Sequence, residues 1–115
     1  MSIELNQQEC CEHYGAQYQP VKTGQLVAIS KGIYEGVTPV EGVRYPSPEH
    51  MSGWWLTTDE YDGNIDSLLT VHFEHIIEKR PELALYMALP FGYRFNLGGE
   101  SEHVWLDQKV AQESI

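Results

Sequence analysis

Alternating apolar and polar positions predict a strand in the middle of the chain. Residues Ser52–Thr57 run SGWWLT, which places Trp54 and Leu56 on one face of a strand and Trp55 on the other, in residue types that favour β-structure. The following segment, Asp59–Asn64, combines Asp, Asn and Gly, which bond their own backbone or adopt a positive φ at little cost. We therefore expect a strand that buries Trp54, turns Trp55 to the other face of the sheet, where a helix, a loop or a partner covers it, and ends in an acidic turn.

Two further regions predict strands. Leu26–Ser30 (LVAIS) is a short apolar run with glycines close on either side, which is typical of a buried strand. Pro90–Phe95 alternates aromatic with small or charged side chains, and Val104–Leu106 follows after Gly98–Gly99. Because paired glycines between two such runs favour a tight turn, this region predicts a hairpin.

The segment between the predicted strands at Leu26–Ser30 and Ser52–Thr57 is rich in proline. Pro39, Pro46 and Pro48 fall within residues Gly36–Glu49. Proline fixes φ and removes a backbone donor. We therefore predict a long irregular loop, with at most edge-strand character near Val40–Tyr45.

The segment Ile65–Arg80 is ambiguous between helix and strand. Apolar residues at positions 69, 73, 76 and 77 fit one face of a helix, while those at 69, 71 and 73 fit a strand. We expect an extended segment to about Thr70 and a helix over Val71–Lys79, ended by Pro81. A short helical turn over Glu82–Ala88 would follow.

These elements predict an α+β fold, with a mainly antiparallel sheet from the strands near 26, 54, 93 and 105 and one principal helix packed on it. At 115 residues the chain is the size of one domain. We assign residues 24–107 to that domain, 1–23 to a lightly structured lead-in with a short helix around Asn6–His13, and 108–115 to a polar tail.

Net charge narrows the range of partners. Seventeen Asp and Glu against seven Lys and Arg give a formal charge of -10, which argues against binding nucleic acid or an anionic membrane and favours basic partners. No apolar run approaches the roughly 20 residues needed to cross a bilayer, and the amino terminus lacks the features of a signal peptide. We expect a cytoplasmic protein.

Candidate reactive groups are few. The sequence holds no GxSxG, P-loop or GxGxxG motif, and the acidic pair Asp59 and Asp62 fits turn capping better than acid–base catalysis. Cys10 and Cys11, near His13, lie in the polar lead-in, where positioned catalysis is not expected. His72 and His75, three apart on a helix, would hold a metal if a third ligand approached. We predict no catalytic residue and no cofactor, and keep a small metal-binding or hydrolytic domain as the alternative.

The order of several short motifs resembles a bacterial family of small immunity proteins from polymorphic toxin systems. The matching pieces are the strand Ser52–Trp54, the acidic turn Asp59–Asp62, the helix and proline at Val71–Pro81, and the LPxGxxF segment Leu89–Phe95. Together they cover about residues 24–107.

The resemblance implies a non-enzymatic cytoplasmic inhibitor that binds a cognate toxin and blocks its active site or substrate access. The acidic charge fits a basic toxin, of which nucleases are the obvious class, because opposite charge speeds association. Aromatic anchors among carboxylates are expected at the interface. The predicted contact residues are Trp55, Asp59, Glu60, Tyr61, Asp62, Tyr34 and Tyr45.

Overall fold

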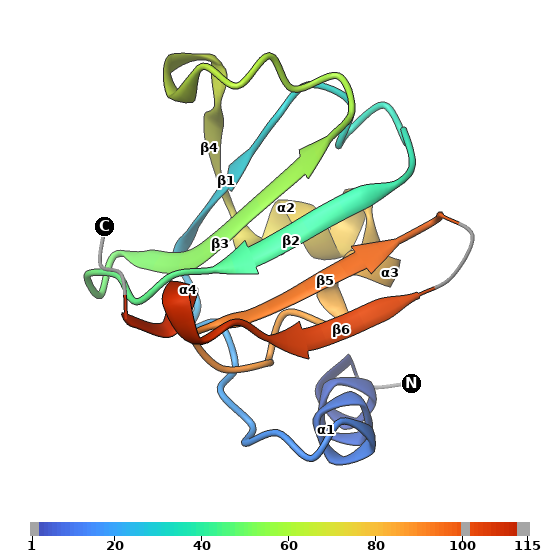
Figure 1. Ribbon diagram of the computed structural model, residues 1–115, viewed down its shortest axis with the longest axis vertical. Coiled ribbons are helices and arrows are strands. Elements are labelled where there is room, and N and C mark those ends of the chain that lie inside the picture. Colours follow the sequence, from blue (N-terminus) through green and yellow to red (C-terminus); the bar gives the residue numbers. More distant parts are fainter. Residues whose placement is uncertain (1–2, 100–101, 113–115) are drawn as a thin grey trace.

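A six-stranded sheet forms the centre of the structure, a computed structural model that describes residues 3–99 and 102–112 (Figure 1). Its strands are β1 (Leu26–Ile29), β2 (Val40–Arg44), β3 (Met51–Thr58), β4 (Leu69–His72), β5 (Tyr93–Leu97) and β6 (His103–Leu106), in the order β4-β1-β3-β2-β5-β6. The pairing of β1 with β3 is parallel, and the other neighbouring pairs are antiparallel. The sheet is therefore mixed. Since β3 inserts between two strands of opposite direction, it must run parallel to one of them.

Several helices surround the sheet, where we expected one principal helix. They are α1 (Ile3–His13), the 3₁₀ turn η1 (Ile65–Ser67), α2 (Phe73–Lys79), α3 (Pro81–Ala84) and α4 (Gln108–Gln112). The predicted helix over Val71–Lys79 is shortened at its start because β4 pairs with β1 through His72. In Figure 1, α2 and α3 lie behind the sheet and α4 lies in front of it. The α+β class is confirmed, and one face of the sheet stays largely open.

The proline-rich segment forms a central strand, which corrects the expected loop. β2 pairs with β3 on one side and with β5 on the other. Pro39 precedes this strand, while Pro46 and Pro48 follow it, so no proline removes a donor from the ladder. The prolines mark the ends of the strand.

The predicted faces of β3 are confirmed. Trp54 is fully buried, its Nε1 donates to the Met87 carbonyl at 2.8 Å, and its ring centroid lies 5.3 Å from that of Phe95. Trp55 points to the opposite, open face and is partly buried. The Trp54 side chain therefore links the sheet to the segment after α3.

The residues before Trp54 have defined structural roles. The Ser52 hydroxyl donates to the Leu26 carbonyl at 2.8 Å and accepts from the Trp54 backbone N–H at 3.1 Å. Gly53 has a φ of 90°, and a Cβ at this position would lie 2.1 Å from the Tyr45 carbonyl oxygen. Only glycine fits such an approach without a backbone shift.

Arg44 is buried on the core side of β2, with 2% of its surface exposed. Its Nε donates to the Ser52 carbonyl at 2.9 Å and its Nη1 to the Leu89 carbonyl at 2.8 Å and to that of Gln19. The guanidinium also lies over the Phe91 ring, 5.1 Å from its centroid. Burial lowers its pKa to about 10. In the described part of the chain no carboxylate forms an ion pair with it.

The amino-terminal stretch, where a lightly structured lead-in with a short helix around Asn6–His13 was expected, holds α1, the longest helix of the described residues. Gln7 and Cys11 of this helix are buried, and the Gln7 amide donates to the Ala84 carbonyl at 2.9 Å. At the other end of the chain, β5 and β6 form the predicted hairpin. Gly98 and Gly99 follow β5 directly, and residues 100 and 101 lie outside the described residues.

Candidate functional site

The acidic turn after β3 is a loop held by its own polar side chains. Asp62 accepts from the Asn64 backbone N–H and from the Ser67 hydroxyl, each at 2.9 Å. These bonds, the one to Asn64 first, lower the pKa of Asp62. Asp59 and Glu60 are exposed. We call residues 59–68 the acidic loop. The hydrogen bonds of Asp62 hold the shape of this loop, while the carboxylates of Asp59 and Glu60 are exposed to solvent.

Two apolar side chains stand out on and beside the acidic loop. Leu69 is 65% exposed and Ile65 is 58% exposed, the highest values among large apolar side chains of the described residues. No Lys or Arg occurs from residue 59 to residue 78. Exposed apolar side chains that are surrounded by charged groups of a single sign are a feature of protein-binding surfaces. The sequence showed the carboxylates, but the apolar spacing placed Leu69 on the buried face of a helix or strand.

Tyr34 lies close to the acidic loop in space. It sits in the turn after β1 and lines a cavity of about 250 Å³ together with Ser67 and Leu69. Its hydroxyl is buried without a hydrogen-bond partner among the described residues. Burial raises the pKa of this phenol. The fold therefore brings Tyr34 next to Ser67, at the end of the acidic loop.

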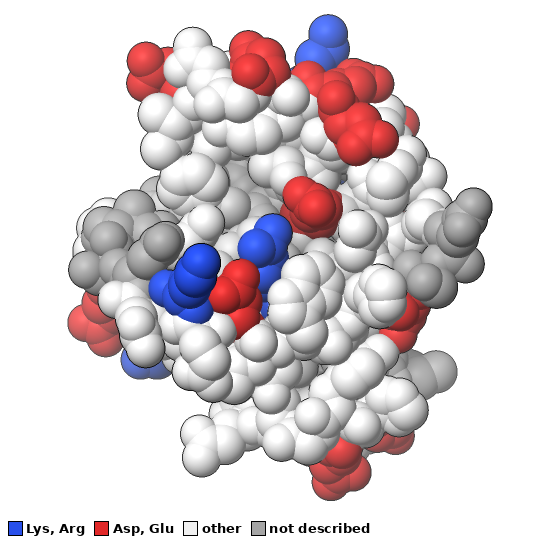
Figure 2. Space-filling view, in the orientation of Figure 1, with Lys and Arg blue, Asp and Glu red and all other residues white. Residues whose placement is uncertain are grey.

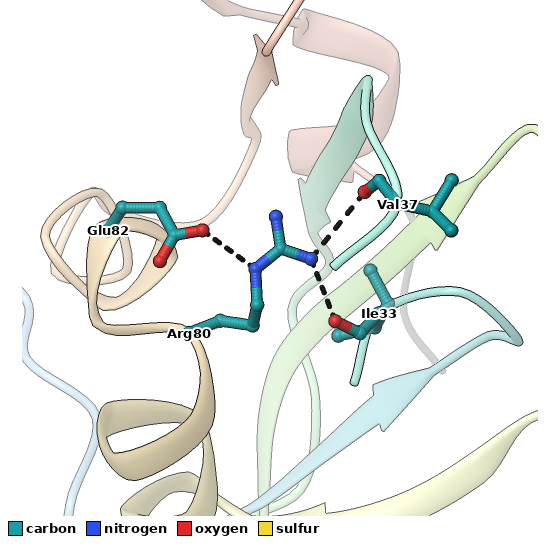
Figure 3. A network of polar contacts seen from close by, with 4 residues as sticks. All are labelled: Ile33, Val37, Arg80 and Glu82. Atoms are coloured by element: carbon teal, nitrogen blue, oxygen red, sulfur yellow. Dashed lines mark hydrogen bonds and ion pairs between the residues drawn. The ribbon is translucent and has the colours of Figure 1, made fainter. Parts of the chain in front are cut away.

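Arg80 holds the segment that carries Tyr34 (Figure 3). This side chain, at the junction of α2 and α3, is 6% exposed. Its Nη1 donates to the Ile33 carbonyl at 2.7 Å and to the Val37 carbonyl at 3.5 Å, while Nε pairs with Glu82 at 2.7 Å. One guanidinium thus fixes both ends of the turn against the helices.

Trp55 and Tyr45 form a separate group. Their ring centroids lie 5.5 Å apart in an edge-on contact. The Tyr45 backbone N–H donates to the Gly53 carbonyl at 2.9 Å, and Trp55 lies in the middle of β3, whereas the acidic loop follows the end of this strand. Trp55 precedes Asp59 by four residues, which span roughly 13 Å in an extended strand. The predicted contact residues therefore occupy two positions on the molecule.

The open face carries a second aromatic feature, formed by Trp105. Trp105 on β6 is 40% exposed, and the Arg94 guanidinium lies 5.4 Å from the centre of its ring. Arg94 also pairs with Asp107 at 3.1 Å, which lowers the pKa of that carboxyl. Figure 2 shows a few Lys, Arg, Asp and Glu side chains among uncharged residues in the middle of this face, with further Asp and Glu toward its upper and lower ends.

The candidate reactive groups are not assembled into a catalytic site. His72 and His75 are exposed, with ring centroids 5.7 Å apart. Within residues 3–99 and 102–112, no group of three or more His, Cys, Asp or Glu side chains is placed to hold a metal. Burial raises the pKa of the Cys10 thiol to about 12, which disfavours the reactive thiolate.

The fold and these surfaces define a small acidic α+β protein with exposed apolar and acidic side chains beside β4. The Imm33-like domain model matches residues 6–107, so the chain belongs to the Imm33-like family, a family of immunity proteins of toxin systems. The predicted resemblance is confirmed, and the match also includes most of α1, which we had placed outside the domain. No curated protein and no solved structure matches the chain. No helix among the described residues has the length and apolar character of a membrane span.

Proposed function

We propose that this protein is a non-catalytic immunity protein that binds a cognate toxin in the cytoplasm and blocks its active site or its access to substrate. Membership of the Imm33-like family carries the proposal. The exposed carboxylates and apolar side chains around the acidic loop supply a surface suited to such binding. Metal-dependent chemistry at His72 and His75 has no supporting observation.

The distribution of charge supports a basic toxin. The chain carries a formal charge of -10, and two of its seven basic residues, Arg44 and Arg80, are buried. Few cations therefore remain outside to offset the carboxylates. Nuclease toxins fit this surface because a groove that binds phosphates is basic. The acidic loop with Tyr34 would attract the toxin, and Trp55 with Tyr45 would add aromatic contacts.

The direct test is co-expression with the toxin encoded beside this protein's gene. We expect a stoichiometric complex on size-exclusion chromatography, loss of toxin activity in the complex, and survival of cells that express both proteins. A toxin that neither binds this protein nor loses activity in its presence would refute immunity by binding.

Reversing charge on the acidic loop should slow toxin association. Asp59 and Glu60 are exposed, and their carboxylates make no hydrogen bond or ion pair with the described residues, so Asp59→Lys with Glu60→Lys should leave the fold intact. We expect the association rate at low salt to fall on the order of tenfold and its salt dependence to weaken. Stopped-flow or surface-plasmon measurements at several salt concentrations test this.

A matched control separates local from overall charge. Glu9→Lys with Glu12→Lys changes the net charge equally, but on exposed positions of α1. This control should alter the rate much less. Equal rates and salt slopes for the two double variants would exclude the acidic loop from the interface.

A further inference from the structure

β4 is an edge strand with a free side. It pairs with β1 and stands at the end of the strand order. Figure 1 shows it at the rim of the sheet, below the acidic loop. An uncovered edge presents backbone N–H and C=O groups that accept another strand.

The register identifies the outward backbone groups. The Phe73 N–H donates to the Gln25 carbonyl at 3.2 Å, and in the same antiparallel ladder Val71 lies opposite Val27. Because hydrogen-bonded and non-hydrogen-bonded pairs alternate, Val71 bonds toward β1. Thr70 consequently directs its N–H and C=O groups, and His72 its N–H, to the free edge, while the His72 carbonyl lies at the N-cap of α2 and accepts the first hydrogen bond of that helix.

The side chains of this edge offer little protection against pairing, although the strand is only four residues long. The strand reads LTVH, with no Lys, Pro or Gly. Leu69 pairs with Ile29 and shares its face of the sheet, which is the face that carries the core. Unlike Ile29, however, Leu69 is 65% exposed. An added strand would extend this apolar layer over Leu69 and remove it from water.

The surroundings favour a basic segment. The acidic loop and Glu74 flank β4, and no Lys or Arg occurs from residue 59 to residue 78. The cavity of about 250 Å³ next to Leu69 is also lined by Tyr34 and Glu35, with Lys31 as its one basic side chain among the described residues. The unpartnered Tyr34 hydroxyl is a hydrogen-bonding group for a side chain that enters.

We propose that an extended, Lys- or Arg-containing segment of the cognate toxin pairs with β4 as a seventh strand. This inference rests on the proposed immunity function and specifies its contact. Main-chain hydrogen bonds to Thr70 and His72 supply affinity, and the flanking carboxylates and the cavity select a basic segment with an apolar residue against Leu69. Residues of β4 thereby join the interface, although none was predicted from the sequence.

Hydrogen exchange of the wild-type complex tests the pairing without any substitution. The amides of Thr70 and His72 should exchange at least about tenfold more slowly in the complex than in the free protein, because each gains a hydrogen-bond partner. Unchanged exchange at both amides in a formed complex would overturn strand addition while leaving the immunity function intact. Failure of the wild-type proteins to form any complex would overturn both.

Thr70→Pro removes one outward N–H and spares the bonds from β4 to β1. We expect it to weaken toxin binding on the order of 100-fold, through the lost bond and the steric block to a paired strand. Thr70→Ala keeps the N–H and should bind nearly as the wild type does. Circular dichroism and urea unfolding establish that both variants fold. Equal affinities for the two folded variants would contradict the proposal.

Leu69→Arg provides a second variant that does not touch the backbone. Because Leu69 is largely exposed, this change should leave stability close to that of the wild type. It places a cation where the basic segment would dock, so toxin affinity should fall on the order of tenfold or more. Unaltered affinity in the folded variant would exclude contact at this edge.

Discussion

Replacing Gly53 by alanine is expected to lower the free energy of unfolding by about 3 kcal/mol or more, the combined cost of a left-handed backbone and a steric clash. Gly53 has a φ of 90°, and the new Cβ would meet the Tyr45 carbonyl oxygen at 2.1 Å. That oxygen belongs to the backbone next to β2, so it cannot move aside as a flexible side chain would. Urea unfolding followed by circular dichroism measures the loss.

Gly63→Ala is the matched control. Gly63 also has a positive φ, 82°, but apart from its two chain neighbours no described residue has an atom within 4 Å of a Cβ built there. Its replacement should cost about 1–2 kcal/mol, from backbone conformation alone. Equal losses for the two alanine variants would show that the Tyr45 carbonyl does not restrict position 53.

Replacing Arg44 by methionine is expected to destabilise the fold by about 3 kcal/mol. Methionine leaves the carbonyls of Ser52, Leu89 and Gln19 without this donor. Each buried acceptor left unsatisfied costs about 1–3 kcal/mol, and relief from burying a charge offsets part of that sum. Such a loss is a large fraction of the stability of a small domain, and chemical unfolding would detect it.

Two further variants separate hydrogen bonding from charge. Arg44→Lys keeps the charge, but one ammonium cannot replace the donors on Nε and Nη1, so this variant should also be destabilised. Arg94→Met removes a partly exposed ion pair on the open face and should cost at most about 1 kcal/mol. A stability of Arg44→Met equal to that of the wild type would contradict this prediction, because it would mean that the three carbonyls accept hydrogen bonds from other donors.

Predictions based on side-chain alternation were reliable because adjacent residues on a strand must face opposite ways. The burial of Trp54, the outward position of Trp55 and the hairpin of β5 and β6 followed from this geometry. The prolines around β2 predict a loop, but all three lie outside the strand, so each of its residues keeps a backbone N–H for the ladder. At Val71 and His72, pairing with β1 prevailed over the helical pattern that continues into α2.

The candidate site was only partly accessible from the sequence. The carboxylates of the acidic loop lie close together in the sequence, so the sequence alone shows an acidic cluster. The exposure of Leu69 depends on which strand forms the edge, and the position of Tyr34 depends on Arg80, almost fifty residues away in the chain. These features arise from tertiary structure, and a local pattern does not encode them.

The free edge of β4 also bears on how copies of this protein behave toward one another. An unprotected edge ordinarily invites pairing between identical chains and then aggregation. Here two copies that met at this edge would each bring a charge of -10 and an acidic loop, and like charges repel. The same carboxylates that would attract a basic toxin thus oppose self-association. We expect this protection to weaken at high salt, where screening is strongest.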